Sequence, residues 1–180
     1  MQLSQLTDES ALVRRAQSDA HAFGALYDRY VQRVYRYCLY RVNHAAEAED
    51  LTAQVFLAAL EALPRYRHDG HFAAWLFAIA RRKVTDAYRR TSHTSLEEAQ
   101  LPPLHMELEL TLEKRQRRES LLKLIQALGE EERELIHLRY VAELSFAEIA
   151  QSLHKNEDAV KKTLYRLVAR LKTQLEADHE

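Results

Sequence analysis

The sequence predicts an all-α protein. Glycine and proline each occur only three times in 180 residues, while Ala, Leu, Glu, Arg and Gln fill long runs, and this composition favours helix. Apolar residues make up 47% of the chain, which is enough for packed cores rather than disorder. They recur with the helical period through residues 8–90 and 112–177.

One interruption divides this helical pattern in two. Residues 91–110 contain Ser and Thr clusters and the pair Pro102-Pro103. Each proline ring removes an amide donor and restricts the residue before it, so helix is disfavoured there. We therefore expect two small helical domains, 1–91 and 112–180, joined by a flexible linker over 92–111.

Four helices are expected in the first domain. They span about residues 8–17, 19–42, 45–63 and 72–90. Pro64 ends the third helix, and a loop from Arg65 to His71, which contains Gly70, leads to the fourth. One face of the fourth helix is apolar, as a core helix requires, and comprises Phe72, Leu76, Ile79, Ala80 and Ala87.

The second domain should also hold four helices. The first two span about residues 112–128 and 130–141, with Gly129 as a C-terminal cap between them. Ser145 and Glu148 have the spacing of a capping box, so a third helix begins there and ends near His154. Asn156 is a good N-cap for the last helix, whose apolar stripe comprises Val160, Leu164, Leu167, Val168, Leu171 and Leu175.

Charge is segregated along the chain, although the net charge is only −1. Residues 65–90 carry seven basic and two acidic side chains, and residues 155–172 carry six basic and two acidic ones. Residues 91–111 between them carry four acidic side chains and no basic one. Two basic patches with an acidic connector favour two contacts with a polyanion.

The last two expected helices have the layout of a helix-turn-helix. The second helix of such a pair can lie in the DNA major groove, where Lys and Arg neutralise phosphates and Asn, Lys and Arg read base edges. The alternative is an ordinary helical hairpin with a solvated charged face. The outward side presents Asp158, Lys162, Tyr165, Arg166 and Ala169, with Lys161 at its flank.

A second candidate nucleic-acid surface is the helix expected at 72–90. Trp75, the only tryptophan, is followed by Arg82 and Arg89 at intervals of seven residues, so the three lie along one edge of the helix. Further polar and basic side chains extend this edge. Aromatic rings beside cations can stack on unpaired bases while the cations hold phosphates. The alternative is a core indole with solvated arginines, since large aromatic residues are mostly buried. The polar residues are Arg81, Arg82, Thr85, Arg89 and Arg90.

Residues 46–56, AEAEDLTAQVF, place an acidic surface beside an apolar ridge. Glu47, Glu49, Asp50 and Gln54 supply the polar side, which can dock on a protein partner. The alternative is a solvated helix start, because acids are favoured near the positive end of the helix dipole.

Enzymatic and metal-binding interpretations have little support. The sequence has no Gly-rich phosphate loop, no GxSxG motif and no Cys–His nucleophile pair. His68 and His71 belong to a polar loop, and a metal site needs three or four convergent ligands. Cys38 lies in an apolar-aromatic run and is expected to be a buried thiol. We expect a protein that is not an enzyme and has no cofactor or metal.

The N-terminal sequence MQLSQLTDES lacks the basic-then-apolar pattern of a secretion signal, and no apolar run approaches the length of a membrane span. We expect a cytoplasmic protein with no membrane insertion.

Taken together, these segments resemble a bacterial RNA polymerase sigma factor of the sigma-70 family, in its compact extracytoplasmic-function (ECF) type. AFGALYDRYVQRVYRYCLYRV resembles the start of sigma region 2, AEDLTAQVFLAAL its core-polymerase-binding segment, and FAAWLFAIARRKVTDAYRR its promoter-melting segment. The stretch from LGEEERELIHLRY to LYRLVARLK resembles region 4. The order and spacing of the segments make the resemblance specific.

This resemblance implies a non-catalytic subunit that binds the clamp helices and flap of core RNA polymerase, recognises promoter DNA and helps open it. It implies polymerase contacts by Glu49, Asp50, Gln54 and Phe56. It implies contacts to the −10 strand by Arg65, Arg67, His68, His71, Trp75, Arg81, Arg82, Arg89 and Arg90, with a flipped base held by the loop. It implies contacts to the −35 duplex by Asn156, Asp158, Lys161, Lys162, Tyr165 and Arg166.

The family also implies that the acidic linker runs through the polymerase toward the RNA path, and that an anti-sigma protein holds the factor inactive. The turn departs from the family pattern, because His154 and Lys155 replace a glycine and a β-branched residue. If position 154 needs a positive φ, histidine is modestly unfavourable there. A sigma-like decoy that sequesters an anti-sigma factor is the main alternative. A stand-alone helix-turn-helix repressor leaves the first ninety residues unexplained.

Overall fold

The computed structural model of the protein describes residues 2–67, 70–91 and 112–177. Helices and turns account for these residues, and no β-strand occurs among them, which confirms the predicted all-α class. None of the described helices is both long enough and apolar enough to span a membrane. The expected linker lies outside the described residues.

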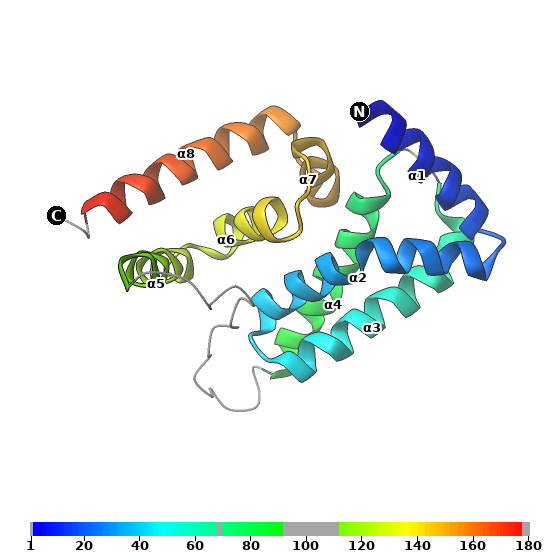
Figure 1. Ribbon diagram of the computed structural model, residues 1–180, viewed down its shortest axis with the longest axis horizontal. Coiled ribbons are helices and arrows are strands. Elements are labelled where there is room, and N and C mark those ends of the chain that lie inside the picture. The colour runs from blue at the N-terminus through cyan, green and yellow to red at the C-terminus, as the bar shows by residue number, and fades with distance from the viewer. Residues whose placement is uncertain (1, 68–69, 92–111, 178–180) are drawn as a thin grey trace.

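Helices α1–α4 form an N-terminal bundle in which α2 packs against α1, α3 and α4 (Figure 1). The Asp19 side chain caps α2 by accepting a 2.9 Å hydrogen bond from the His21 amide, and Asn43 ends α2 with φ 56°. A 3-10 turn, η1 (Leu63–Arg65), follows α3 and contains Pro64. The helices are α1 (Gln2–Ala16), α2 (Ala20–Val42), α3 (Ala45–Ala62) and α4 (Phe72–Thr91).

Helices α5–α8 form a C-terminal bundle on the other side of the molecule (Figure 1). The expected helix at 130–141 is divided, because an α-helix there continues as a π-helix before the chain turns. The elements are α5 (Leu112–Gln126), α6 (Glu130–Ile136), the π-helix η3 (His137–Val141), α7 (Phe146–Leu153) and α8 (Glu157–Ala177).

The role predicted for Gly129 is wrong. Gly129 has φ −60° and ψ 156°, so it is the N-cap of α6 and not a left-handed C-terminal cap of α5. The carbonyls at the end of α5 are satisfied by a side chain instead. The guanidinium of Arg133 donates hydrogen bonds of 2.7 Å to the Gln126 carbonyl and 2.8 Å to the Leu128 carbonyl.

The two caps predicted in the C-terminal bundle are confirmed. Ser145 and Glu148 form a reciprocal capping box, with N···O distances of 2.7 and 3.2 Å. The Asn156 side chain accepts hydrogen bonds from the backbone amides of Asp158 and Ala159, so it caps α8. These local bonds fix where both helices of the predicted helix-turn-helix begin.

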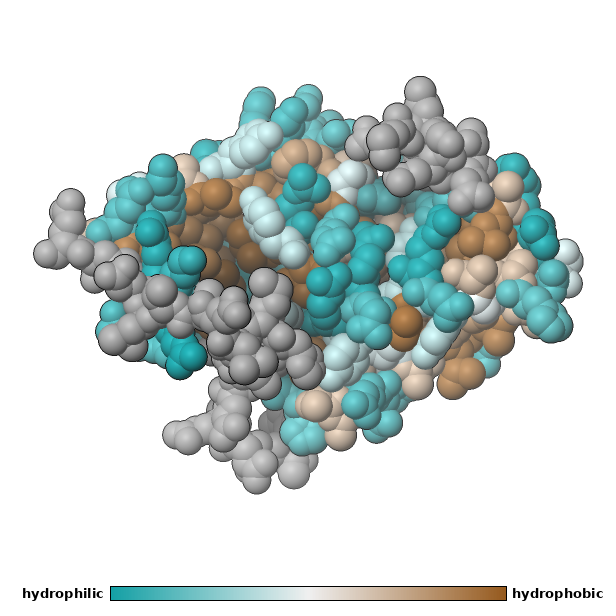
Figure 2. Space-filling model, in the orientation of Figure 1, coloured by the Kyte–Doolittle hydropathy of each residue, from teal (hydrophilic) through white to brown (hydrophobic). Residues whose placement is uncertain are grey.

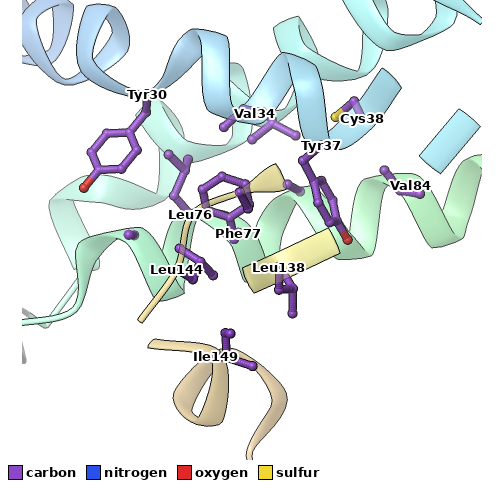
Figure 3. Packing of buried hydrophobic residues seen from close by; sticks show 14 of the residues in the cluster. Tyr30, Val34, Tyr37, Cys38, Leu76, Phe77, Val84, Leu138, Leu144 and Ile149 are labelled. Carbon is purple, nitrogen blue, oxygen red and sulfur yellow. The ribbon is translucent and has the colours of Figure 1, made fainter. Parts of the chain in front are cut away.

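The two bundles share one continuous apolar core. Figure 3 shows Leu138, Leu144 and Ile149 of the C-terminal bundle beside Phe77 of α4 and Tyr37 of α2. These five side chains have no more than 1% of their surface exposed. Cys38 lies in the same core, as predicted. The sequence indicates two domains, and the structure adds that they are packed against each other.

Candidate nucleic-acid interface

The basic edge of α4 is presented as the helical period predicts. Arg82, Arg89 and Arg90 are exposed and Arg81 is half-buried, while Leu76 and Ala80 on the opposite side are fully buried. Arg82 has only a loose contact with Asp86, with 3.9 Å between Nε and the carboxylate. Its charge therefore stays accessible to phosphates.

Trp75 lies at the boundary between the apolar and basic faces of α4, and it is half-buried. Its ring is 4.7 Å from the Tyr66 ring and 5.4 Å from the Phe72 ring, centroid to centroid. Two aromatic neighbours make Trp75 a packed side chain that joins the loop to α4. One part of its surface remains open to a ligand.

The loop before α4 is held by a residue that the sequence did not single out. The side-chain amide of Gln17, just after α1, donates hydrogen bonds to the Leu63 carbonyl at 3.1 Å and the Tyr66 carbonyl at 2.7 Å. Arg65 and Arg67 on this loop are exposed and His71 is half-buried. His68 lies outside the described residues. No local sequence signal marks Gln17, because its partners come from a distant segment.

The outward face of α8 is free of the apolar core. Val160, Leu164, Leu167 and Leu171 are buried against the bundle, whereas Val168 is 37% exposed. Tyr165 is 58% exposed, and its ring lies 5.8 Å from that of Phe146 on α7. The remaining predicted −35 residues are all exposed: Asn156, Asp158, Lys161, Lys162 and Arg166.

The turn between α7 and α8 adopts a left-handed conformation. His154 has φ 53° and ψ 40°, so the position where the family has glycine does require a positive φ. Lys155 does not enter the core, since its Nζ atom lies 2.9 Å from the carboxylate of Glu131 on α6. The ion pair between Lys155 and Glu131 lies within the C-terminal bundle and holds the turn against α6.

The acidic surface on α3 is only partly as predicted. Glu49 and Asp50 are exposed and Gln54 is half-buried, but Phe56 is 5% exposed. The Phe56 ring packs 4.7 Å from the Tyr27 ring, so this residue supports the surface from beneath.

Apolar residues gather at the end of the molecule that α2 and α3 form (Figure 2). Leu57 and Leu60 of α3 are 60% and 42% exposed, and Tyr27 of α2 is 42% exposed. Leu57 continues the row of Asp50 and Gln54 at helical spacing. The helical spacing was sufficient to place Leu57 on the same surface as Asp50 and Gln54, although Leu57 was not among the residues predicted there.

An open groove separates the basic edge of α4 from the C-terminal bundle. Arg81, Arg82 and Arg89 line one wall, and Glu130 and Glu131 line the other. The two carboxylates are paired on their own wall of the groove, Glu130 with Arg41 at 3.5 Å and Glu131 with Lys155 at 2.9 Å.

Comparison with known proteins divides the chain in the same way, with one family model matching each half. Residues 26–94 match the family model for Sigma-70 region 2, and residues 118–171 match that for Sigma-70, region 4. The ECF RNA polymerase sigma factor ShbA of Streptomyces griseus is 34% identical over 177 residues, covering 90% of this chain and 92% of ShbA. The ECF RNA polymerase sigma factor BldN of Streptomyces coelicolor is 39% identical, but the match spans 89% of this chain and only 63% of BldN.

A solved structure is similar over nearly the whole chain. It is that of CnrH in complex with the cytosolic domain of CnrY, which matches 94% of this chain and 97% of the solved chain, with a TM-score of 0.68 and 26% sequence identity.

Proposed function

The chain belongs to the sigma-70 family of RNA polymerase sigma factors, in its ECF type, and we propose that it directs core RNA polymerase to promoters. In this proposal residues 1–91 bind the polymerase and the −10 element, and residues 112–180 bind the −35 element. The observation that carries it is the pair of exposed basic faces, one on α4 and one on α8, that one chain presents.

The −35 duplex is assigned to the outward face of α8. Lys162 and Arg166 stand one turn apart and are exposed, so their charges are available to phosphates or to guanine edges. Asp158 near the helix start can accept a hydrogen bond from a cytosine amino group. The capped N-terminus at Asn156 supports this role, because recognition helices meet base edges with their first turns.

The −10 strand is assigned to the loop after α3 and the basic edge of α4. Arg65 and Arg67 lie on either side of Tyr66, whose ring packs against Trp75. The loop therefore places cations that can bind phosphates beside rings that can stack on bases. A base that leaves the stack would be held by this loop, with His68 and His71 beside it. Arg81, Arg82, Arg89 and Arg90 would follow the backbone of the strand along α4.

Core polymerase is assigned to the exposed row on α3. Glu49, Asp50, Gln54 and Leu57 would meet the clamp helices, and the region 4-like bundle would meet the flap. Phe56 would act through packing, because it is buried beneath that row. An anti-sigma protein is a further proposed partner, and the solved structure of CnrH with the cytosolic domain of CnrY supports it.

The competing proposal is a sigma-like decoy that binds an anti-sigma factor and never touches DNA. Such a protein has no need of the basic faces on α4 and α8. Both faces are populated by exposed Arg and Lys in this chain, which favours the initiation factor.

Run-off transcription with purified core polymerase and a pool of genomic promoters separates the two proposals. An initiation factor yields promoter-specific transcripts and a stable complex with core. If neither a transcript nor a complex with core forms, the proposed function is wrong. An anti-sigma complex in the absence of transcripts would establish the decoy.

A further inference from the structure

The two bundles meet along α2, and the two ends of that contact differ. At one end Arg33 donates hydrogen bonds of 2.6 and 2.9 Å to the Ala142 carbonyl and one of 3.2 Å to the Glu143 carbonyl. Glu143 has φ 57°, so the chain bends sharply after η3 where Arg33 meets it. Two turns further along α2 the bundles leave an open cavity of about 460 Å³, which we call the interbundle pocket.

The interbundle pocket is lined by six side chains from four elements, α2, α4, α6 and η3. Five of the six can donate a hydrogen bond. The volume falls in the range of small-molecule sites, about 300–1,000 Å³, and far exceeds the share of one water molecule, about 30 Å³. The lining residues are Tyr40, Arg41, Tyr88, Glu130, Arg133 and His137.

Three of these side chains are incompletely hydrogen-bonded. Arg41 Nε, Arg133 Nε and His137 Nδ1 are buried and have no hydrogen-bond partner within the described part of the chain. Arg41 and His137 are only 8% and 4% exposed. Buried polar atoms in native proteins nearly always have a partner. Three such atoms on the walls of one pocket therefore indicate a partner that comes from outside the protein.

Charge favours an anion over water as that partner. Arg41 is already paired, at 2.7 Å with Glu134 and at 3.5 Å with Glu130. The Glu130 side chain, the acidic member of the lining, is 82% exposed and is engaged by Arg41. Among the described residues Arg133 bonds to backbone carbonyls and to no carboxylate. The pocket thus contains a guanidinium whose charge is not compensated.

The titratable groups of the lining are affected by this positive charge. Burial, and then Arg41 and Arg133, lower the pKa of His137 from 6.5 to about 4. Burial raises the pKa of Tyr40, and two arginines, Arg118 and Arg36, oppose that rise. A bound anion would act on His137 in the opposite direction to the arginines, because it favours the protonated imidazole.

We propose that the interbundle pocket binds a small phosphate-bearing anion, either inorganic phosphate or a compact phosphomonoester. Its oxygens would accept hydrogen bonds from the Arg133 guanidinium, the His137 imidazole and the phenol of Tyr88. The donors come from separate helices, so a tetrahedral anion can meet them from several sides, whereas a planar carboxylate cannot. Binding at this pocket goes beyond transcription initiation and does not depend on it.

Histidine NMR signals of the full chain measure binding at the pocket itself. The chain is titrated with inorganic phosphate, and separately with adenosine monophosphate, at constant pH and at an ionic strength held constant with sodium chloride. We expect saturable shifts of the His137 imidazole signals toward those of imidazolium. The signals of His21, which is exposed, should stay unchanged. Loss of a signal in His137→Gln assigns it.

Arg133→Gln is the test variant, and Arg115→Gln is its matched control. Both remove one positive charge, but Arg115 lies on the exposed surface of α5, outside the pocket. We expect Arg133→Gln to raise the dissociation constant for phosphate about tenfold or more, because hydrogen bonds from a charged donor are lost. We expect Arg115→Gln to leave it unchanged.

Arg133 also holds the carbonyls at the end of α5, so Arg133→Gln can fail to fold. In that event Tyr88→Phe decides, because it removes one hydroxyl donor and keeps the ring. We expect it to raise the dissociation constant about fivefold. An unchanged dissociation constant in a folded Arg133→Gln, or in Tyr88→Phe where that variant decides, contradicts the proposal.

The two probes distinguish the two sources of the phosphate group. Tighter binding of adenosine monophosphate identifies a phosphomonoester, and tighter binding of inorganic phosphate identifies the free ion. If neither probe shifts the His137 signals saturably, the proposal is wrong and water is the partner of the buried nitrogens. Equal weakening by Arg133→Gln and Arg115→Gln also overturns it, since attraction to the basic surface would then be diffuse. These measurements use neither polymerase nor DNA, so their outcome is independent of the proposed function.

Discussion

The side-chain amide of Gln17 lies 2.7 Å from the backbone carbonyl of Tyr66, although the two residues are 49 positions apart in the chain. The same amide also reaches the Leu63 carbonyl at 3.1 Å. One side chain after α1 thus sets the path of the loop that carries Arg65 and Arg67. The loop assigned to the −10 strand is therefore positioned by a side chain from a distant part of the sequence.

Gln17→Ala removes both of these hydrogen bonds. We expect a loss of about 1–2 kcal/mol in the free energy of unfolding, because two partly buried carbonyls lose their donor. We also expect slower promoter opening with unchanged polymerase binding. Urea unfolding and open-complex formation measure the two effects. Ser18→Ala, at the exposed neighbouring position, serves as the control and should change neither quantity.

Trp75 should act mainly as a packed residue. Trp75→Phe keeps an aromatic ring against Tyr66 and Phe72, so we expect a loss of about 1 kcal/mol or less. Trp75→Ala removes the packing, and we expect a loss of about 2 kcal/mol, below the cost for a fully buried tryptophan. Thermal unfolding measures both changes. Normal stability of Trp75→Phe combined with lost strand opening would show that the indole stacks on a base.

The turn before α8 should be stabilised by glycine. His154 has φ 53°, which is unfavourable for a residue with a Cβ atom. His154→Gly is expected to raise the free energy of unfolding by about 1 kcal/mol and to leave −35 affinity unchanged. Gln174→Gly, in the regular part of α8, should lower it by about the same amount. If urea unfolding shows that His154→Gly lowers the free energy of unfolding as much as Gln174→Gly does, the backbone at residue 154 is not strained.

The salt dependence of promoter binding tests the face of α8. Lys162→Ala with Arg166→Ala removes two exposed cations from the assigned DNA surface, so binding should weaken and its logarithmic salt slope should fall by about two. Lys172→Ala lies on the same helix but near its C-terminal end, where Lys172 is beside Glu176. It should leave the slope at the wild-type value. An unchanged slope in the double variant means that α8 is not on DNA.

His137 makes folding stability depend on pH. Burial, and then the positive charges of Arg41 and Arg133, lower its pKa from 6.5 to about 4. The folded state therefore favours neutral histidine, so the contribution is complete above pH 6.5 and is lost as the pH falls toward 4. The loss approaches about 3 kcal/mol. The pocket that His137 and these two arginines line is completed by Tyr40, Tyr88 and Glu130.

His137→Gln isolates that contribution, because carboxylates titrate in an overlapping range. The difference in unfolding free energy between wild type and His137→Gln should shrink between pH 6.5 and 4. Urea unfolding at closely spaced pH values measures it. A difference that stays constant across this range would place His137 in water in the folded protein.

Helix boundaries were predictable where the determinants are local. Ser145 and Glu148 are three residues apart, and Asn156 caps the amides that directly follow it, so sequence spacing alone identified both starts. Gly129 was misassigned because the end of α5 is satisfied by Arg133, a side chain from the next helix. A glycine between helices is compatible with either cap, and only the long-range partner distinguishes them.

The packing of the two bundles was beyond sequence reasoning. Tyr37 and Glu134 are 97 residues apart, and neither belongs to a motif that announces a partner. The basic edge of α4 and the outward face of α8 were predictable, because each is written in the period of a single helix. The helical period of a single helix does not determine which of its faces the other bundle covers.

The contact between Arg33 and the Ala142 carbonyl involves the main chain of one partner. Side-chain replacement at 142 leaves such an acceptor in place, whereas replacement of Glu134 removes one. Chimeras between this protein and its relatives should follow that distinction. A grafted C-terminal half needs a carboxylate at the position of Glu134 and the sharp bend after η3, while the identity of residue 142 can drift among small residues. Compatibility between halves from different relatives would then depend on one acidic side chain and one backbone bend.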